Sequence, residues 1–239
     1  MSNLIPETVP HHVAIIPDGN RRYAKGLGKE PWYGHEVGAK NTEILIKKAH
    51  QLRIRELTFW GSSLENLKKR PLDETRALLR IYETYFQELA SNVDIHENQV
   101  RVRFIGRWRE QFPDSLKQIL IGIEEATKDY QEYGLNFLLA YSGDDDMLEA
   151  VNTLTRRFGS SDKEIKKEDI KGALMTHELP EVDYLIRTGG DPHLSAGFMM
   201  WDVANAELFF SEALYPAFDE KAFEQAIIDF GGRGRRHGK

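Results

Sequence analysis

The chain has 239 residues, 41% of them hydrophobic, which is enough for one α/β domain with a sizeable core. It contains no cysteine, which excludes disulfide bonds and thiol catalysis and favours a cytoplasmic location. Its net charge of -6 excludes a general nucleic-acid-binding protein, so we expect no nucleic-acid partner.

We expect one domain over residues 11–239, preceded by a short flexible arm over residues 1–10. The arm lacks the charged start and long apolar stretch of a signal peptide. No apolar run approaches the roughly 18 residues that cross a membrane as a helix. The domain ends in a helix over residues 219–230 and a basic tail over residues 231–239, and such tails are ordinarily disordered.

The most informative stretch lies near the start of the domain. Residues 13–16 form a short apolar run that predicts a buried strand. The run ends in Pro-Asp-Gly-Asn, which is typical of a turn, and ligands bind at this end of a strand in open α/β sheets. A surface turn with an incidental salt bridge is the alternative. The groups that could bind Mg²⁺ or phosphate oxygens here are Asp18, Gly19, Asn20, Arg21 and Arg22.

The next elements include a second strand that ends in polar residues. Residues 24–32 are glycine-rich and indicate a loop, and a helix is predicted over residues 36–52. His35, just before that helix, is by itself a polar cap. A strand over residues 57–60 ends in a polar loop with Asn66, which again places hydrogen-bonding groups at a strand end.

Residues 73–98 predict one long helix with apolar residues every three or four positions. The stripe includes the aromatic residues Tyr82, Tyr85 and Phe86. Most of this stripe is expected to face the core.

The middle of the chain predicts strands over residues 100–105 and 135–141, the second almost wholly apolar, as at the centre of a parallel sheet. Between them we expect a loop over residues 106–112 and a helix over residues 113–133. Three aspartates at 144–146 open a further helix, where the helix dipole favours them, and a metal site is the alternative.

A short helix over residues 167–175 precedes the last polar motif. A strand over residues 182–186 leads into Arg-Thr-Gly-Gly-Asp-Pro-His-Leu-Ser, from Arg187 to Ser195. Arginine, hydroxyls and glycine amides suit a diphosphate, and a turn with a structural arginine is the alternative. Residues 201–210 lead to Glu207, which by itself is a solvated strand-end carboxylate.

Several of these motifs, in this order and spacing, resemble those of the cis-prenyltransferase (undecaprenyl diphosphate synthase) family. The resemblance runs from His12 to the C-terminus. It implies a single α/β domain with a central, mainly parallel sheet of about six strands, flanked by helices that wall a hydrophobic tunnel. The motifs are residues 12–22, Gly34-His35, residues 62–66, residues 183–190, residues 206–210 and Arg236-His237-Gly238.

The resemblance also implies roles for individual residues. Asp18 and Glu207 would hold Mg²⁺, and Asp18, Asn20 and Asn66 would be catalytic. Gly19, Arg21, Arg22 and Arg70 would bind substrate phosphates, and His35 would face the allylic diphosphate. Arg187, His193 and Ser195 would bind the C5 diphosphate, and Arg236 and Gly238 would cross to the partner subunit of a homodimer to complete that site.

The chain departs from the family pattern at several positions. Pro31 stands where a phosphate-binding arginine is usual, and His193 stands where the second C5-binding arginine is usual. Leu67 replaces an aromatic residue, and the longer loop leaves open whether Lys69 or Arg70 contacts phosphate. Ala140, Asp144 and the pair Asp191-Pro192 also differ.

The resemblance implies a prenyltransferase that condenses an allylic isoprenyl diphosphate with isopentenyl diphosphate, forms a Z double bond and releases diphosphate. The departures leave head-to-middle coupling onto dimethylallyl diphosphate as one alternative. A terpene synthase that removes diphosphate is a second. A non-catalytic partner subunit is a third, although such subunits tend to lose the opening aspartate. The lipid product would allow peripheral membrane association.

Overall fold

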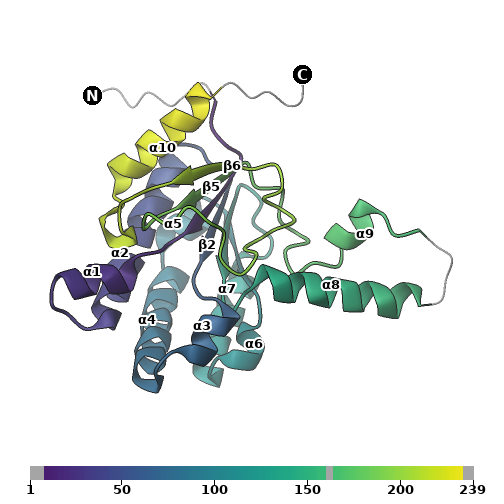
Figure 1. The fold of residues 1–239 in the computed structure, drawn as a ribbon, viewed down its shortest axis with the longest axis horizontal. Coiled ribbons are helices and arrows are strands. Elements are labelled where there is room, and N and C mark those ends of the chain that lie inside the picture. Colours follow the sequence, from purple (N-terminus) through teal and green to yellow (C-terminus); the bar gives the residue numbers. More distant parts are fainter. Residues whose placement is uncertain (1–7, 160–163, 234–239) are drawn as a thin grey trace.

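The computed structural model describes residues 8–159 and 164–233. They form a six-stranded sheet in the order β3-β4-β2-β1-β5-β6, and every neighbouring pair is parallel (Figure 1). The predicted α/β fold with its mainly parallel sheet is therefore confirmed. The strands are β1 (His12–Ile16), β2 (Glu56–Trp60), β3 (Val100–Ile105), β4 (Tyr133–Leu138), β5 (Tyr184–Arg187) and β6 (Glu207–Phe210).

The strand order changes direction at β1. The chain places β2 on one side of β1 and, much later, β5 on the other. In open α/β sheets the carboxyl ends of the strands diverge at such a switch point and leave a crevice for a ligand. The Pro-Asp-Gly-Asn turn follows β1 directly, and the Arg187 motif follows β5, so two of the predicted motifs meet there.

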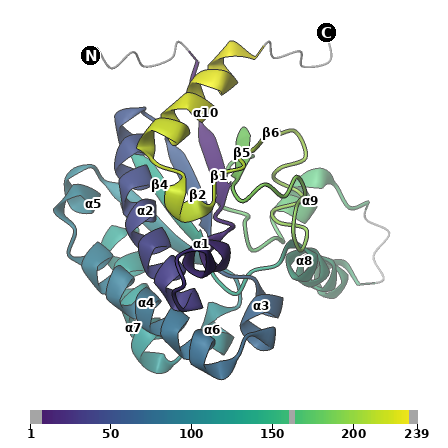
Figure 2. The same ribbon diagram turned by 60° about the vertical axis from the view of Figure 1, so that its left-hand side comes forward.

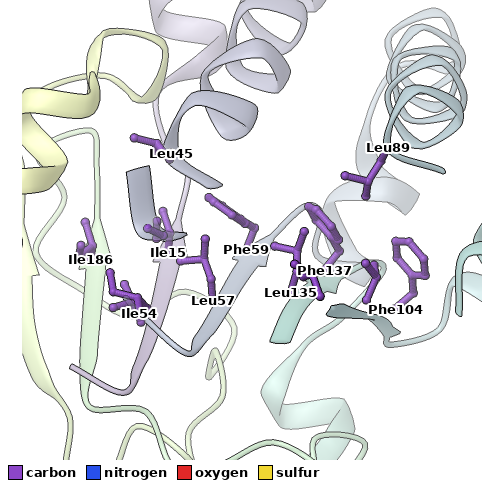
Figure 3. Close-up of a cluster of buried hydrophobic side chains, with 14 of the residues drawn as sticks. Ile15, Leu45, Ile54, Leu57, Phe59, Leu89, Phe104, Leu135, Phe137 and Ile186 are labelled. Atoms are coloured by element: carbon purple, nitrogen blue, oxygen red, sulfur yellow. The ribbon is translucent and has the colours of Figure 1, made fainter. Parts of the chain in front are cut away.

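Helices lie on both sides of the sheet (Figure 2), and the larger hydrophobic core lies under those on one side. Ile15, Phe59 and Phe137 lie opposite one another on three neighbouring strands and pack under Leu45 and Leu89 (Figure 3). The helices are α1 (Asn20–Gly26), α2 (Pro31–Gln51), α3 (Leu64–Lys69), α4 (Leu72–Ala90), α5 (Val93–Glu97), α6 (Trp108–Gln111), α7 (Asp114–Thr127), α8 (Gly143–Phe158), α9 (Lys167–Lys171), the 3-10 helix η1 (Tyr215–Ala217) and α10 (Glu220–Gly232).

The opposite face carries a second, smaller core. Ala14 and Leu185 of the sheet pack there with Phe198 and Met199 from the segment between β5 and β6. That segment is therefore fixed by burial close to the carboxyl end of β5. None of the helices in the described part of the chain is both long and apolar enough to cross a membrane.

The prediction of a loop over residues 24–32 was wrong for most of its length. Helix α1 begins at Asn20 and runs to Gly26, and Pro31 opens α2, since proline suits the first turn of a helix. His35 therefore lies within α2 instead of capping it. The glycines of this segment indicated a longer loop, whereas the loop between the two helices is only residues 27–30.

Other boundaries also differ from the predictions. The single helix over residues 73–98 is in fact α4 and α5, because Asn92 starts a new helix by accepting a hydrogen bond from the Asp94 amide at 2.9 Å. The loop around Asn66 is largely α3, with Ser63 as its cap. The loop over residues 106–112 contains α6, and the helix over 113–133 ends at Thr127, before β4 begins.

Candidate functional site

A polar pocket of about 740 Å³ lies at the carboxyl edge of the sheet, beside α1. Its lining comes from the ends of β1, β2 and β5 and from α1, α2 and α3. The predicted site residues that line it are Asp18, Gly19, Asn20, Arg21, Arg22, His35, Asn66, Arg70, Arg187 and Ser195. The fold thus brings together residues from four separate motifs.

Asp18 is the carboxylate within this pocket. Arg187 contacts one of its oxygens at 2.9 Å, and Arg22 contacts the other at 3.3 Å. Its backbone carbonyl accepts hydrogen bonds from the hydroxyl of Thr188 at 2.8 Å and the amide of Tyr215 at 2.9 Å. These contacts fix the turn, so the carboxylate is held in place between two guanidinium groups.

Two glycines permit the close approach of the turn and the Arg187 motif. Gly19 has a φ of 105°, and a Cβ on it would lie 2.8 Å from Leu214. Gly189 has a φ of 93°, and a Cβ on it would lie 2.5 Å from Nη2 of Arg22. Larger residues at either position would therefore strain the backbone and displace neighbours.

The first arginine cluster consists of Arg21, His35 and Arg70. Nη1 of Arg70 donates to Nε2 of His35 at 3.1 Å, so the other ring nitrogen of a neutral His35 is the one that carries a proton. Burial, followed by the charges of Arg70 and Arg21, lowers the pKa of His35 to about 3. Glu74 lies beneath this cluster and contacts all three residues.

The second arginine cluster consists of Arg187, His193 and Ser195. Nη1 of Arg187 donates to Oγ of Ser195 at 2.8 Å and also to the backbone carbonyl of His193. The His193 ring lies 3.2 Å from the same Oγ, but His193 does not line the pocket. Its role as a diphosphate ligand stays a prediction.

Two buried polar atoms at this site have no hydrogen-bond partner among the described residues. They are Oδ1 of Asn20 and Nε of Arg187. Buried polar groups are almost always paired, because an unpaired one costs about 1–3 kcal/mol. Both residues line the pocket, so these atoms are consistent with a polar ligand that completes the site.

An apolar pocket adjoins the polar one and shares Asn20, His35 and Trp60 with it. Its volume is only about 70 Å³, and Tyr82, which donates a hydrogen bond from its hydroxyl to the Gly61 carbonyl at 2.7 Å, is part of its wall. The predicted tunnel is not present as an open channel here, and it stays a proposal. The other aromatic side chains in the lining are Phe59, Tyr85, Phe86, Phe137 and Tyr215.

The structure does not bring the two predicted Mg²⁺ ligands together within one chain. Glu207 starts β6, pairs in register with Tyr184 at the amino side of the sheet, and contacts Arg233 at 3.4 Å. No cluster of three or more metal-binding side chains occurs in residues 8–159 and 164–233. Asp18 alone fits Mg²⁺ in the way this ion usually binds, with one carboxylate plus substrate phosphates.

The predicted tail residues Arg236 and Gly238 lie outside the described residues, as does most of the predicted N-terminal arm. The sequence reading missed the pocket residues Lys25 and Lys29. Lys25 follows Arg21 by four residues on α1, a helical spacing that the predicted loop concealed, whereas Lys29 lies in the loop over residues 27–30. Neither lysine has a carboxylate within ion-pair distance among the described residues.

The three adjacent aspartates do not form a separate site. Asp145 pairs with Arg107 at 2.9 Å, and Asp146 accepts hydrogen bonds from the Tyr141 hydroxyl and the Met175 amide. Two of the three carboxylates therefore hold α8 to its neighbours.

Comparison with known proteins agrees with this geometry. Residues 16–238 match the family model described as "Putative undecaprenyl diphosphate synthase". The chain is 39% identical over 234 residues to a tritrans,polycis-undecaprenyl-diphosphate synthase (geranylgeranyl-diphosphate specific) from Pyrococcus horikoshii, covering 97% of this chain and 88% of the relative. It is 36% identical over 238 residues to an isoprenyl transferase from Thermus thermophilus, covering 97% and 89%.

A solved structure is also similar over nearly the whole fold. It is lavandulyl diphosphate synthase from Lavandula x intermedia in complex with dimethylallyl diphosphate, with a TM-score of 0.89 and 29% identity. The similarity covers 97% of this chain and 99% of that one. The sequence motifs, the parallel sheet and these matches agree, and the chain belongs to the undecaprenyl diphosphate synthase family of prenyltransferases.

Proposed function

We propose that this protein transfers a prenyl group from an allylic isoprenyl diphosphate to isopentenyl diphosphate. The observation that carries this proposal is that Asp18 shares one pocket of about 740 Å³ with the first arginine cluster and with Arg187 and Ser195 of the second. Each cluster suits one diphosphate, because guanidinium groups match phosphate oxygens in charge and geometry. Two diphosphates side by side are what a condensation of two prenyl diphosphates requires.

The first arginine cluster is the better candidate for the allylic diphosphate. His35 lines both the polar and the apolar pocket, so a diphosphate bound there would have its hydrocarbon chain directed into the apolar pocket. Arg187 and Ser195 would then bind the C5 diphosphate. This division agrees with the roles implied by the sequence resemblance.

In the reaction, the allylic C–O bond breaks and its electron pair leaves with the diphosphate. The double bond of the C5 substrate forms the new C–C bond, and the condensed product loses one proton. Arg21, Arg22 and Arg70 stabilise the charge that develops on the leaving oxygens. Arg187 and Ser195 hold the second substrate beside the allylic carbon. A Mg²⁺ bound by Asp18 and the phosphates would add further positive charge at the leaving group.

We also propose that the active form is a homodimer. β6 lies at the edge of the sheet and Leu208 on it is 40% exposed, which leaves room for a second copy. Glu207 and the tail with Arg236 and Gly238 would then contribute to the partner's pocket. This would account for the position of Glu207 at the opposite end of the sheet from Asp18. A cytoplasmic enzyme with a lipid product would meet the membrane at its surface.

The runner-up is head-to-middle coupling onto dimethylallyl diphosphate. The likeness to lavandulyl diphosphate synthase and the histidine at position 193 favour it. A non-catalytic subunit fits poorly, because Asp18, Asn20 and Arg22 all line the pocket. A terpene synthase would have no need of a second arginine cluster.

Product analysis separates these functions. The enzyme is incubated with Mg²⁺, an allylic diphosphate of 10 to 20 carbons and labelled isopentenyl or dimethylallyl diphosphate, and the products are identified by mass spectrometry. The proposal expects linear Z-products from isopentenyl diphosphate. A branched product from dimethylallyl diphosphate alone supports the runner-up, and free diphosphate without condensation contradicts both.

The same assay tests the hydrocarbon pocket. Tyr82→Ala removes a side chain from its wall, so we expect products at least one isoprene unit longer than those of the wild type. Tyr130→Ala, at a partly buried tyrosine outside this pocket, is the control and should leave the product length unchanged. An unchanged product length in Tyr82→Ala contradicts the assignment of this pocket to the growing chain.

A further inference from the structure

Glu74 is a buried carboxylate beneath the first arginine cluster. It lies in the first turn of α4, and its side chain is 5% exposed. Its Oε1 lies 3.2 Å from Nη1 of Arg70, 3.5 Å from Nε of Arg21 and 3.9 Å from Nε2 of His35. Glu74 does not line the polar pocket, whereas its three partners do.

Helix stability alone does not account for this carboxylate. Acidic residues in the first turn of a helix are favoured by its dipole, but the exposed Asp73 beside it has the same advantage without burial. Removing a charged group from water costs several kcal/mol unless good partners compensate. Here the compensation comes from side chains of the pocket.

Charge alone does not account for it either. A negative charge beneath an anion-binding cluster opposes the binding of a diphosphate. Its benefit is geometric: Oε1 and the ring nitrogen of His35 both engage Nη1 of Arg70, and the other guanidinium nitrogens of Arg70 have no hydrogen-bond partner among the described residues. Arg70 is thus fixed by one nitrogen and keeps its remaining donors for a ligand.

The same contact extends to His35. Because Arg70 donates to Nε2 of His35, it selects the tautomer whose Nδ1 carries the proton. Glu74 therefore orients an arginine directly and, through it, a neutral hydrogen-bond donor. It also contacts Arg21, whose side chain is 60% exposed.

We propose that Glu74 is a positioning residue of the allylic diphosphate subsite, where it holds Arg70, His35 and Arg21 in a geometry that matches one diphosphate. This inference rests on the proposed function for the division between the two substrates. It does not depend on which C5 diphosphate is the acceptor.

The test compares variants of Glu74, Asp73 and Arg70 in binding and in turnover. Binding of farnesyl diphosphate, without a C5 substrate, is measured by calorimetry, so the readout does not need the reaction. We expect Glu74→Ala to raise the Kd about tenfold or more, since misplaced charge-assisted hydrogen bonds carry costs of this size. Glu74→Gln keeps the shape and an acceptor oxygen, so it should stay within about threefold of the wild type.

Asp73→Ala is the matched control, because it removes a carboxylate from the same helix turn without touching the cluster. It should leave the Kd within about twofold of the wild type. In turnover, Glu74→Ala should raise the KM for the allylic substrate and leave the KM for the C5 substrate nearly unchanged. Adding Glu74→Ala to Arg70→Ala should cost little more than Arg70→Ala alone, because the two act through one another.

Three results would overturn the inference. Equal or tighter binding by Glu74→Ala would show that the carboxylate only opposes the ligand's charge. A parallel rise in both KM values together with a lower Tm would show a general structural role. Additive losses in the double variant would show that Glu74 does not act through Arg70. If wild-type enzyme binds farnesyl diphosphate but makes no condensation product, the proposed function fails while the binding test still decides the role of Glu74.

Discussion

The two edges of the sheet both bury charged and polar side chains, yet they differ in what those groups contact. At the amino edge, Glu56 accepts hydrogen bonds from Arg103 at 3.0 Å and from Asn136 at 2.7 Å, and Asn136 also reaches the Thr58 hydroxyl. That hydroxyl contacts His12 at 2.8 Å. At the carboxyl edge, Asp18 and Glu74 face a larger number of basic groups.

Both edges also contain a pocket, so a cavity alone does not mark the site. The pocket at the amino edge has about 490 Å³, but its arginines 55, 101 and 103 each pair with a glutamate. Around the polar pocket at the carboxyl edge, the carboxylates of Asp18, Glu74 and Asp191 pair with four arginines, and two lysines have no carboxylate partner among the described residues. Uncompensated positive charge distinguishes the candidate site from the structural network.

The largest effect on turnover, and the largest difference between turnover and stability, is expected at Asp18. Asp18→Ala should reduce kcat by about 10²-fold or more, as removal of a key electrostatic group at a reacting centre usually does. The free energy of unfolding should change less than in Glu56→Ala, because the backbone contacts of the turn remain and the buried Arg187 keeps the His193 carbonyl and Ser195 as partners. Steady-state kinetics and urea denaturation measure the two effects. A variant that keeps more than about a tenth of the wild-type rate contradicts the role of Asp18.

Glu56→Ala should show the opposite pattern. Removing one partner from a buried charged pair leaves Arg103 and Asn136 underpaired, so we expect a loss of about 3 kcal/mol in the free energy of unfolding. The kcat/KM should stay within about twofold of the wild type at temperatures where the variant is folded. Glu132→Ala, which breaks an exposed pair with Arg55, is the control and should cost about 1 kcal/mol or less. A large kinetic effect of Glu56→Ala would contradict the assignment of a purely structural role to the amino edge.

His12 should make the amino edge sensitive to acid. Burial lowers the pKa of His12 to about 4, so between pH 6.5 and 4 the unfolded chain binds a proton that the folded chain does not. The free energy of unfolding should therefore fall as the pH falls through this window, by up to about 3 kcal/mol from this residue. His35 contributes in the same direction, because its pKa is lowered to about 3.

Denaturation of the wild type and His12→Gln between pH 4 and 8 measures this effect. The variant keeps a hydrogen-bonding side chain but cannot titrate, so its stability should depend less steeply on pH below 6.5. An unchanged slope would mean that other groups account for the acid sensitivity.

The smallest effect is expected at Lys29. It is exposed and lines the polar pocket, two residues from the proline that replaces the family's usual arginine. Lys29→Ala should raise the KM for the allylic diphosphate about two- to fivefold, with kcat unchanged, since an exposed charge contributes up to about 1 kcal/mol. The difference should shrink in high salt. Lys40→Ala, exposed on α2 outside the pocket, should show no effect, and equal effects would mean that Lys29 acts only through net charge.

The sequence was sufficient for much of the site, because most of its residues follow strands. Asp18 and Arg187 are 169 positions apart, yet each ends or follows an apolar run, and parallel strands bring their carboxyl ends to one edge. Glu74 escaped prediction because it lies inside an amphipathic helix, where a carboxylate in the first turn is ordinary. Lys25 and Lys29 escaped because the glycines around them indicated a loop.

The sequence by itself determined the strands, the turns that end them and the family, because apolar runs and turn residues act locally. The tertiary structure decided which charges are compensated. It buried Glu74 beneath two arginines and a histidine, kept that histidine, His35, neutral through burial, and placed Glu207 at the amino side of the sheet instead of beside Asp18. These outcomes depend on strand order and on helix packing between distant segments. The energy of a charged group is set by its three-dimensional environment and not by its neighbours in the sequence.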